Sequence, residues 1–340
     1  MVIKENDNEK ISWVTSIPFI LFHFTLIFLP FIDITAADVA VCVGFYYLRM
    51  FFITAGYHRY FSHRSFKMSR FPQFLMAVGG TLAMQKGPLW WASHHRVHHK
   101  YSDTDLDVHS PKKGFWWSHL GWILCSKYDE PVFEKIHDFS KFPELRILDR
   151  FYLLPPFLTA FLFWYFYGWG MLLVGFCLST ILLYHGTFSI NSLAHVFGRR
   201  RYSTSDTSRN SFLLALITCG EGWHNNHHHY QSSARQGFRW WELDLSFYVL
   251  KLLSLFRIVR DLKAPNEKAL KRKLLADGYF DDGMFNAYYE QAISSVNSVK
   301  NEALTIYSKK QAALKKIMDE TKVIADELAH LSTESKKLVN

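Results

Sequence analysis

The sequence predicts an all-α integral membrane protein with four transmembrane helices in two hairpins and a cytoplasmic helical cap that is rich in histidine. Four apolar blocks are each long enough to cross a bilayer, which takes about 20 helical residues. Histidine is unusually frequent, with 17 in 340 residues, and it clusters in segments outside these blocks. The hydrophobic share of 49% and the aromatic share of 17% exclude an intrinsically disordered chain. Only four cysteines are present, without a Cys-x-x-Cys pair, so a disulfide scaffold is excluded and an iron–sulfur site is disfavoured.

The apolar blocks define the expected membrane topology. The turn near Asp33 and Asp38 and the turn at Gly168 carry no Lys or Arg, whereas the segments outside the hairpins hold nearly all of the positive charge. By the positive-inside rule, both termini and the long central segment are expected in the cytoplasm. We therefore expect a multi-pass protein of a bacterial inner membrane or the endoplasmic reticulum, with spans at residues 11–32, 36–57, 151–167 and 169–193.

The chain is expected to have three parts. A cytoplasmic tail covers residues 1–10, and a membrane domain covers 11–265, with its cap formed by 58–150 and 194–265. From residue 266 to 340, Lys, Glu, Ala and Leu dominate, which predicts a soluble helical extension. This extension is expected either to pack on its own domain or to make a coiled-coil contact with a partner.

Four histidine clusters follow the ends of the spans or lie in the cap. On an α-helix, positions i, i+3 and i+4 share one face, so two of the clusters can each present three imidazoles to one point. His58 and His63 are five residues apart, about 140° on an ideal α-helix, so they either serve different metals or sit where the helix ends. The candidate ligands are His58 and His63; His95, His98 and His99; Asn191 and His195; and His224, His227 and His228.

Nine clustered imidazoles predict a metal centre. A structural zinc site closes at four ligands, so nine favour two six-coordinate metals in a dinuclear redox centre. Imidazole suits Fe, Zn, Cu and Ni, so the ligand type does not choose the metal. Nearby carboxylates are expected to accept the second ring N–H of the metal-bound histidines. These acids are Asp103, Asp105, Asp107, Asp206 and Glu221.

The clusters resemble those of the integral-membrane fatty-acid desaturases of the stearoyl-CoA Δ9 type. The similarity covers about residues 13–241 and includes ITAGYHR at 53–59, HRVHHKYSDTDLDVHSP at 95–111, GFWWSHLGW at 114–122, NSLAH and GEGWHNNHH. The resemblance implies two iron ions held by the nine histidines, with Asn191 contributing through a water. It also implies that O₂ is the co-substrate for inserting a cis double bond into a saturated acyl chain, with Δ9 as the expected position. We hypothesise a preference for chains of 16 to 18 carbons.

The acyl carrier expected from the resemblance is CoA. Ser93 and His94 stand where the animal acyl-CoA enzymes carry an Arg-Asp pair that helps to hold the CoA headgroup, so an acyl group on a membrane lipid is the alternative. Arg96, Lys112 and Lys113 are candidates for binding the CoA phosphates. Alternatively, they belong to a solvated or lipid-facing surface.

An apolar substrate tail needs a dry tunnel. Tyr46 and Trp91 are expected to line it, and Tyr46, about three helical turns before His58, is expected to limit the chain length. The sequence contains no haem segment resembling cytochrome b5 and no Cys₄ cluster. Electrons are therefore expected from a separate carrier, such as cytochrome b5 or a ferredoxin, that docks on the cap. No nucleic-acid partner is expected.

Two other functions compete with desaturation. A histidine-rich membrane hydroxylase would use the same metals but leave oxygen in the product. A metal transporter would place its ligands at the middle of the membrane, whereas these clusters lie at span ends and in the cap.

Overall fold

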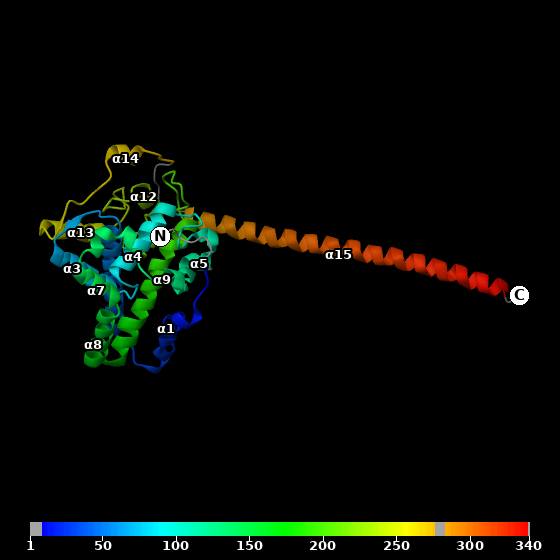
Figure 1. Cartoon of the computed structure of the whole chain (residues 1–340), viewed down its shortest axis with the longest axis horizontal. Helices are drawn as coiled ribbons and strands as arrows, with labels where there is room; N and C mark the ends of the chain where they lie inside the picture. The colour runs from blue at the N-terminus through cyan, green and yellow to red at the C-terminus, as the bar shows by residue number, and fades with distance from the viewer. Residues whose placement is uncertain (1–8, 276–282, 339–340) are drawn as a thin grey trace. The chain divides into compact units, whose positions relative to one another are not determined.

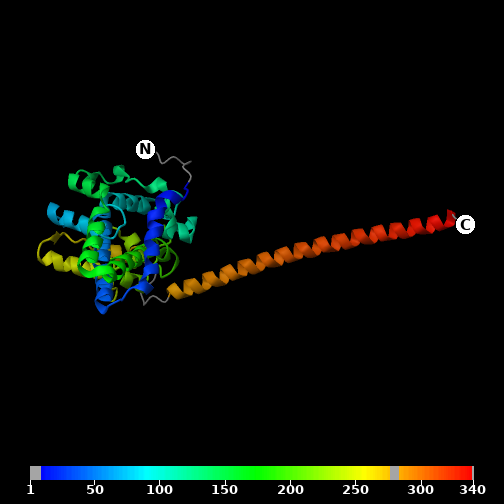
Figure 2. The same cartoon turned by 90° about the horizontal axis from the view of Figure 1, so that it is seen from below.

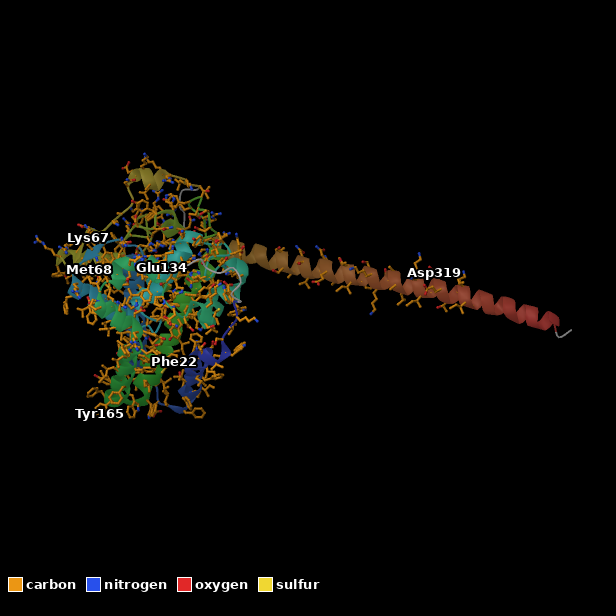
Figure 3. All side chains as sticks on the ribbon, viewed as in Figure 1. Phe22, Lys67, Met68, Glu134, Tyr165 and Asp319 are labelled. Atoms are coloured by element: carbon orange, nitrogen blue, oxygen red, sulfur yellow. The ribbon has the colours of Figure 1, made fainter. Side chains whose placement is uncertain are left out.

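The computed structural model describes residues 9–275 and 283–338 and forms two compact units, Met1–Phe285 and Asn286–Asn340. The first unit is a bundle of helices with a cap of short helices and loops at one end (Figures 1 and 2). Aromatic side chains such as Phe22 and Tyr165 extend from the lower, membrane-directed part of this unit, whereas Lys67 and Glu134 lie toward the cap (Figure 3).

The helices of the bundle change type along their length. α1 (Trp13–Phe24) continues as the 3₁₀ helix η1 (Thr25–Phe31), and α2 (Ala36–Phe51) continues as the π-helix η2 (Phe52–Ser62). After the first part of the cap come α8 (Leu154–Gly170), the π-helix η7 (Met171–Leu178), α9 (Ser179–Asn191) and α10 (Leu193–Val196).

The cap is made from two stretches of chain. Its first stretch contains β1 (Lys67–Met68), α3 (Arg70–Thr81), α4 (Pro88–Tyr101), η3 (Pro111–Lys113), α5 (Phe115–His119), η4 (Gly121–Leu124), η5 (Ser126–Tyr128), η6 (Phe133–Lys135), α6 (His137–Ser140) and α7 (Pro143–Arg150). Its second stretch contains α11 (Phe212–Ile217), α12 (His224–His229), α13 (Leu245–Leu255), β2 (Val259–Arg260) and α14 (Glu267–Lys271). β1 and β2 pair antiparallel, with Met68 opposite Val259, so a small sheet joins the two stretches.

Three segments among the described residues are long and apolar enough to cross a membrane, rather than the four that the sequence predicted. They are Trp13–Phe31, Ala36–Ser62 and Leu154–Val196. The third has 43 residues, which as one straight helix would measure about 65 Å, roughly twice the hydrocarbon core of a bilayer. It departs from helical geometry at Gly168, with φ 81° and ψ −164°, a conformation that glycine adopts readily. Figure 1 shows α8 and α9 side by side, so the predicted turn at Gly168 is present within this segment.

The two turns that the sequence placed outside the cytoplasm lie close together. Thr35 and Asp38 begin α2 with a capping box, in which the Thr35 N–H donates to Asp38 Oδ2 at 2.9 Å. A Cβ on Gly170 would lie 2.8 Å from the same carboxylate oxygen, so this residue, next to the turn at Gly168, approaches the start of α2. Both turns are therefore at one end of the bundle.

The helix α4, which carries three of the clustered histidines, is anchored at its first turn by Asp149 of α7. The N–H groups of Leu89 and Trp90 donate to Asp149 Oδ1 at 2.8 and 3.0 Å. Pro88 occupies the first helical position, where the missing N–H costs nothing. Burial raises the pKa of Asp149 from 3.8 to about 6, against the lowering effect of these two hydrogen bonds.

This raised pKa predicts a pH dependence of stability. Since the folded state holds the Asp149 proton more tightly than the unfolded state, the stabilisation is fully present below about pH 4 and is lost as the pH rises through 6. The free energy of unfolding that depends on this proton is about 3 kcal/mol at most. We expect the melting temperature of Asp149→Asn, measured in detergent between pH 4 and 7, to lack this component of the wild-type decline. Parallel curves for the two proteins would contradict the assignment.

The predicted start of the C-terminal extension at residue 266 stays a prediction. α14 belongs to the first unit, where Leu274 forms a β-bridge with Tyr202 of the cap. The extension contains one helix, α15 (Gly283–Leu338), of 56 residues. Within the second unit, Leu314 and Ile317 are 57% and 60% exposed, so this unit does not cover its own apolar face there.

Candidate metal centre

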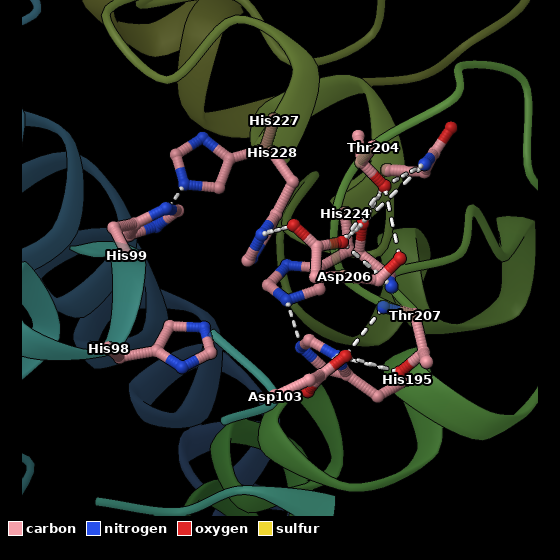
Figure 4. Close-up of polar contacts among 12 residues, drawn as sticks. His98, His99, Asp103, His195, Thr204, Asp206, Thr207, His224, His227 and His228 are labelled. Atoms are coloured by element: carbon pink, nitrogen blue, oxygen red, sulfur yellow. Dashed lines mark hydrogen bonds and ion pairs between the residues drawn. The ribbon is translucent and has the colours of Figure 1, made fainter. Parts of the chain in front are cut away.

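All nine predicted histidines come together in two adjoining groups. Within each group the candidate ligand atoms lie within 4.8 Å of one another, and no described side chain of either group is exposed. Figure 4 shows the second group, with His99 and His227 of the first beside it. The first group is His58, His63, His95, His99 and His227, and the second is His98, His195, His224 and His228.

The spacing of the histidine triplets predicted that each triplet would converge on one point. The structure instead divides both triplets between the two groups. On α4, His95 and His99 join the first group and His98 joins the second. On α12, His227 joins the first group, while His224 and His228 join the second. Position i+4 is only about 40° from i, whereas i+3 lies about 60° to the other side. Each helix can therefore supply ligands to both groups at once. The candidate centre lies where α4 faces α12.

The π-helix η2 explains how His58 and His63 come to lie in the same group, although they are five residues apart. Its hydrogen bonds run from residue i+5 to residue i, so residues five apart lie about one turn above each other. The His63 N–H donates to the His58 carbonyl at 3.2 Å, and the two imidazole centroids are 4.8 Å apart. The two histidines therefore belong to the same group, at the end of the helix.

Four buried carboxylates orient four of the histidines. His98 Nδ1 lies 3.0 Å from Asp107 Oδ1, and His228 Nδ1 lies 2.8 Å from Asp206 Oδ2. A carboxylate only accepts, so each Nδ1 carries the proton and each Nε2 carries a lone pair. The other two pairs are His58 Nδ1 with Glu221 at 2.5 Å and His195 Nδ1 with Asp103 at 3.2 Å. Asp105, also considered from the sequence, is exposed and serves no histidine.

The protonation states suit metal binding. Burial lowers the pKa of His95 and His99 well below 6.5, so both are neutral at pH 7, the form that coordinates metals. Burial alone would raise the pKa of Asp107, but the neighbouring His98 and His109 lower it below its ordinary value. Asp107 is therefore ionised at pH 7, and the imidazoles of His95 and His99 are available as neutral ligands.

The arrangement of lone pairs fits bound cations. With their Nδ1 protons directed at carboxylates, His58 and His195 point Nε2 lone pairs inward, where the Nε2 atoms of His227 and His224 lie 3.0 Å away. His99 Nε2 lies 2.8 Å from His227 Nε2. The buried Nε2 of His228 has no hydrogen-bond partner among the described residues. Imidazole nitrogens crowded in this way are stabilised by metal ions between them.

An apolar cavity of about 570 Å³ reaches the first group from the bundle of apolar helices. Trp91, His95 and Asn191 line it together with Phe22 and Tyr184. Of the two residues expected to line a substrate tunnel, Trp91 lines this cavity and Tyr46 does not. The Tyr46 hydroxyl instead donates to the carbonyl of Ile217 at 2.9 Å. The expected control of chain length by Tyr46 thus has no support in this cavity.

The three cationic side chains that the sequence analysis considered for binding the CoA headgroup differ in their surroundings. Arg96 donates to the carbonyls of Ser62 and Lys135 at 2.9 and 2.7 Å and to Asp138, so it holds the end of η2. Lys113 Nζ lies 2.8 Å from Glu9. Lys112 is exposed. Arg96 is therefore engaged within the protein, and of the three only the Lys112 side chain makes no hydrogen bond or ion pair with the described residues.

Arg59 is a site residue that the sequence reasoning missed. It is fully buried beside His58 and forms ion pairs with Glu221 at 3.0 Å and Asp244 at 2.8 Å. Glu221 therefore contacts a candidate ligand and a buried cation at once. Arg59 directly follows the candidate ligand His58 in the sequence, but its partners are 162 and 185 residues away in the chain.

Asp107→Asn is expected to weaken the centre without unfolding the protein. An amide can no longer enforce the His98 tautomer, and changes to residues that support a ligand lower metal affinity or activity about 10–100-fold. The measurement is bound metal per chain after dialysis against a graded chelator. Asp105→Asn is the matched control in the same loop and should behave as wild type. Equal metal retention in both variants would show that Asp107 does not support the site.

Comparisons with known proteins give the same assignment over most of the chain. Residues 36–253 match the fatty acid desaturase family. An acyl-CoA C20 Δ5-desaturase of Anemone leveillei is 38% identical over 285 residues, covering 80% of this chain and 90% of that protein. An sn-1 stearoyl-lipid 9-desaturase of Anabaena variabilis is 36% identical over 274 residues, covering 79% and 100%. Delta-9 acyl-lipid desaturase 1 of Arabidopsis thaliana is 37% identical over 270 residues, covering 78% and 87%.

Proposed function

Because the chain belongs to the fatty acid desaturase family, we propose that it is an O₂-dependent enzyme that introduces a cis Δ9 double bond into a saturated C16–C18 acyl chain. The observation that carries this proposal is the pair of histidine groups, backed by buried carboxylates, at the end of an apolar cavity. Cavities of this size that are mostly apolar with a few polar groups are typical ligand sites.

The metals of this proposal are two iron ions. The five histidines of the first group would hold one ion and the four of the second group the other, with Asn191, which lines the apolar cavity, acting through a water. Bound iron would supply the oxygen chemistry that removes hydrogen from an unactivated methylene, which acid–base catalysis cannot do.

The chain's own residues would position the substrate and keep water away. Phe19, Phe22 and Phe188 give the cavity an apolar wall for the acyl tail. Trp91 stacks on His95, with centroids 4.9 Å apart, at the point where the cavity meets the first group. A methylene of the acyl chain beside Trp91 would lie next to the metal ligands. The number of carbons between the carboxyl end of the acyl chain and Trp91 would therefore select the carbon that reacts.

The same proposal includes the membrane arrangement. The segment Leu154–Val196 would cross twice, with its turn at Gly168, to give four spans and both termini on the cytoplasmic side together with the cap. The adjacent turns near Asp38 and Gly170 support this orientation, because both hairpin turns lie together at one end of the bundle.

The acyl carrier has two candidates. CoA is expected from the resemblance to acyl-CoA enzymes, and the Anemone leveillei relative is named for acyl-CoA. A membrane lipid is the second candidate, since two of the relatives are named for lipid-linked chains and Arg96 is occupied within the protein.

The test is expression in a host that lacks its own Δ9-desaturase, followed by chromatography and mass spectrometry of total fatty acids. We expect 16:1 and 18:1 Δ9 products with wild type and none with His98→Ala. Products that gain oxygen instead of losing two hydrogens would identify a hydroxylase. Purified enzyme supplied with stearoyl-CoA or with stearoyl phospholipid vesicles then separates the two carriers.

A further inference from the structure

The apolar cavity that reaches His95 also reaches the side of the helical bundle. Leu21 of α1 and Phe157 of α8 both line the cavity, and they are 59% and 58% exposed. Residues that line a cavity and are more than half exposed mark a place where the cavity meets the surface. We call the place between Leu21 and Phe157 the lateral opening.

The surface around the lateral opening is apolar. Leu21 and Phe157 each belong to a segment that is long and apolar enough to cross a membrane. Ile17, Phe24 and Leu158 of the same two helices are exposed as well. A contiguous apolar surface of this kind is rare on proteins surrounded by water and is typical of contact with lipid. The lateral opening therefore faces the hydrocarbon of a bilayer when these segments cross it.

The lateral opening lies in the half of the spans that is nearer to the cap. α1 is joined to the cap at its start, where the Ser12 N–H donates to the Leu124 carbonyl at 2.8 Å, and α8 follows α7 of the cap. Leu21 lies about 12 Å along α1 from its first residue, and Phe157 lies about 5 Å along α8 from its first residue. Since a hydrocarbon core is about 30 Å thick, both residues lie at the level of the leaflet on the cap side.

The wall that α1 gives to the cavity is thinly packed. In the segment Trp13–Phe31, 6% of the residues in the most apolar window are buried, compared with 44% in Ala36–Ser62 and 56% in Leu154–Val196. Pro18 lines the cavity from inside α1, and because it has no N–H, one helical hydrogen bond is missing at this level. α1 can therefore move aside for an acyl chain with little loss of packing.

The lining of the cavity offers no free cation to a CoA headgroup. Lys86 is the only Lys or Arg among the described lining residues, and its Nζ lies 2.9 Å from Oδ1 of Asp129, which also lines the cavity. Arg96, Lys112 and Lys113 do not line it. A phosphate taken out of water needs cations or several N–H donors as partners. The cavity thus suits an uncharged chain rather than the phosphates of CoA.

We propose that the cavity takes an acyl chain that is attached to a membrane lipid of the leaflet on the cap side, and that this chain enters sideways through the lateral opening between α1 and α8. This inference rests on the proposed function and chooses between its two carriers. The lipid headgroup stays at the membrane surface and only the apolar chain leaves the bilayer, so no charge has to lose its water. Inside the cavity the chain reaches Trp91 and His95 beside the metal ligands.

The test uses a phosphatidylcholine with a photoreactive diazirine in its sn-1 stearoyl chain, in vesicles that contain the full-length protein. After irradiation, mass spectrometry of the peptides locates the labelled residues, and this labelling requires neither iron nor turnover. We expect label at Leu21 or Phe157 and also at Trp91, because the chain passes the first two residues to reach the third. Label at outward residues such as Ile17 with none at Trp91 would overturn the proposal.

A matched pair of variants tests the route itself. Leu21→Trp and Ile17→Trp make similar changes in size at exposed positions of α1, but only Leu21 lines the cavity. We expect Leu21→Trp to lower the label at Trp91 about tenfold, because the indole fills the opening, and Ile17→Trp to lower it less than twofold. Equal labelling of Trp91 in the two variants would show that the chain does not pass Leu21, and would overturn the proposal.

A stearoyl-CoA analogue with the same diazirine separates the two carriers. We expect it to label Trp91 much more weakly than the lipid probe does. Stronger labelling by the CoA analogue, unchanged in Leu21→Trp, would assign a route from the cap and would overturn the proposal. Labelling of Trp91 by the lipid probe without desaturation of either substrate by wild type would refute the proposed function, while it would support the lateral route.

Discussion

Replacing His227 with alanine is expected to reduce desaturation to below about 1% of wild type and to release metal from the first group. His227 Nε2 lies 3.0 Å from His58 Nε2 and 2.8 Å from His99 Nε2, so it stands between ligands supplied by η2 and α4. Its loss should cost more than the roughly 10–100-fold effect of changing a residue that only supports a ligand.

The measurement for His227→Ala is iron content per chain together with product formation in the desaturase-deficient host. His137→Ala is the control, because His137 is exposed on α6 and belongs to neither group. Both variants should reach the membrane at wild-type levels. Full activity in His227→Ala would remove it from the ligand set and would weaken the division into five and four histidines.

Arg59→Met is expected to have the largest effect on stability. The guanidinium is fully buried, pairs with Glu221 and Asp244, and donates to the carbonyl of Ala234 at 2.8 Å. Removing one member of a buried ion pair leaves its partner without compensation, which typically costs about 3–5 kcal/mol. We expect most of the variant to be aggregated or degraded, as judged by size-exclusion chromatography in detergent.

Two further variants make this result specific. Arg64→Met is the matched control, since Arg64 pairs with Asp138 at 2.6 Å but its side chain is 57% exposed, and exposed pairs contribute about 1 kcal/mol or less. Combining Arg59→Met with Asp244→Asn should recover part of the folded protein, because one buried charge is then removed along with its partner. A wild-type melting temperature for Arg59→Met alone would show that the network does not stabilise the cap.

The arrangement explains why Arg59 and His58 are adjacent in the chain. His58 turns toward the first histidine group, and Arg59 turns toward Asp244, whose side chain also caps α13 by accepting from the Phe247 N–H at 3.0 Å. Glu221 lies between the two and contacts both. The network thus joins the end of η2 to the residues that precede α12 and α13. Its Glu221 carboxylate also holds the candidate ligand His58.

Much of the candidate centre was predictable from local spacing. The nine histidines were recognisable because residues three and four apart share a helix face, and two triplets repeat that pattern. The supporting role of Asp103, Asp107, Asp206 and Glu221 followed from the requirement that metal-binding imidazoles donate their second N–H. The break at Gly168 was visible because an apolar run longer than one span contains a residue free to turn.

Other features depended on contacts between distant parts of the chain. The division of the two triplets between the groups and the ion pairs of Arg59 arise where α4, η2 and the segments that begin α12 and α13 meet. The π-helix that aligns His58 with His63 is stabilised by packing rather than by any marked sequence signal. By itself the sequence determined which residue types share one helix face, because that follows from the geometry of a single helix. Only the tertiary structure decided which faces meet, because contacts such as those of His227 with His58 and of Arg59 with Glu221 join residues more than 100 positions apart and depend on how the helices pack.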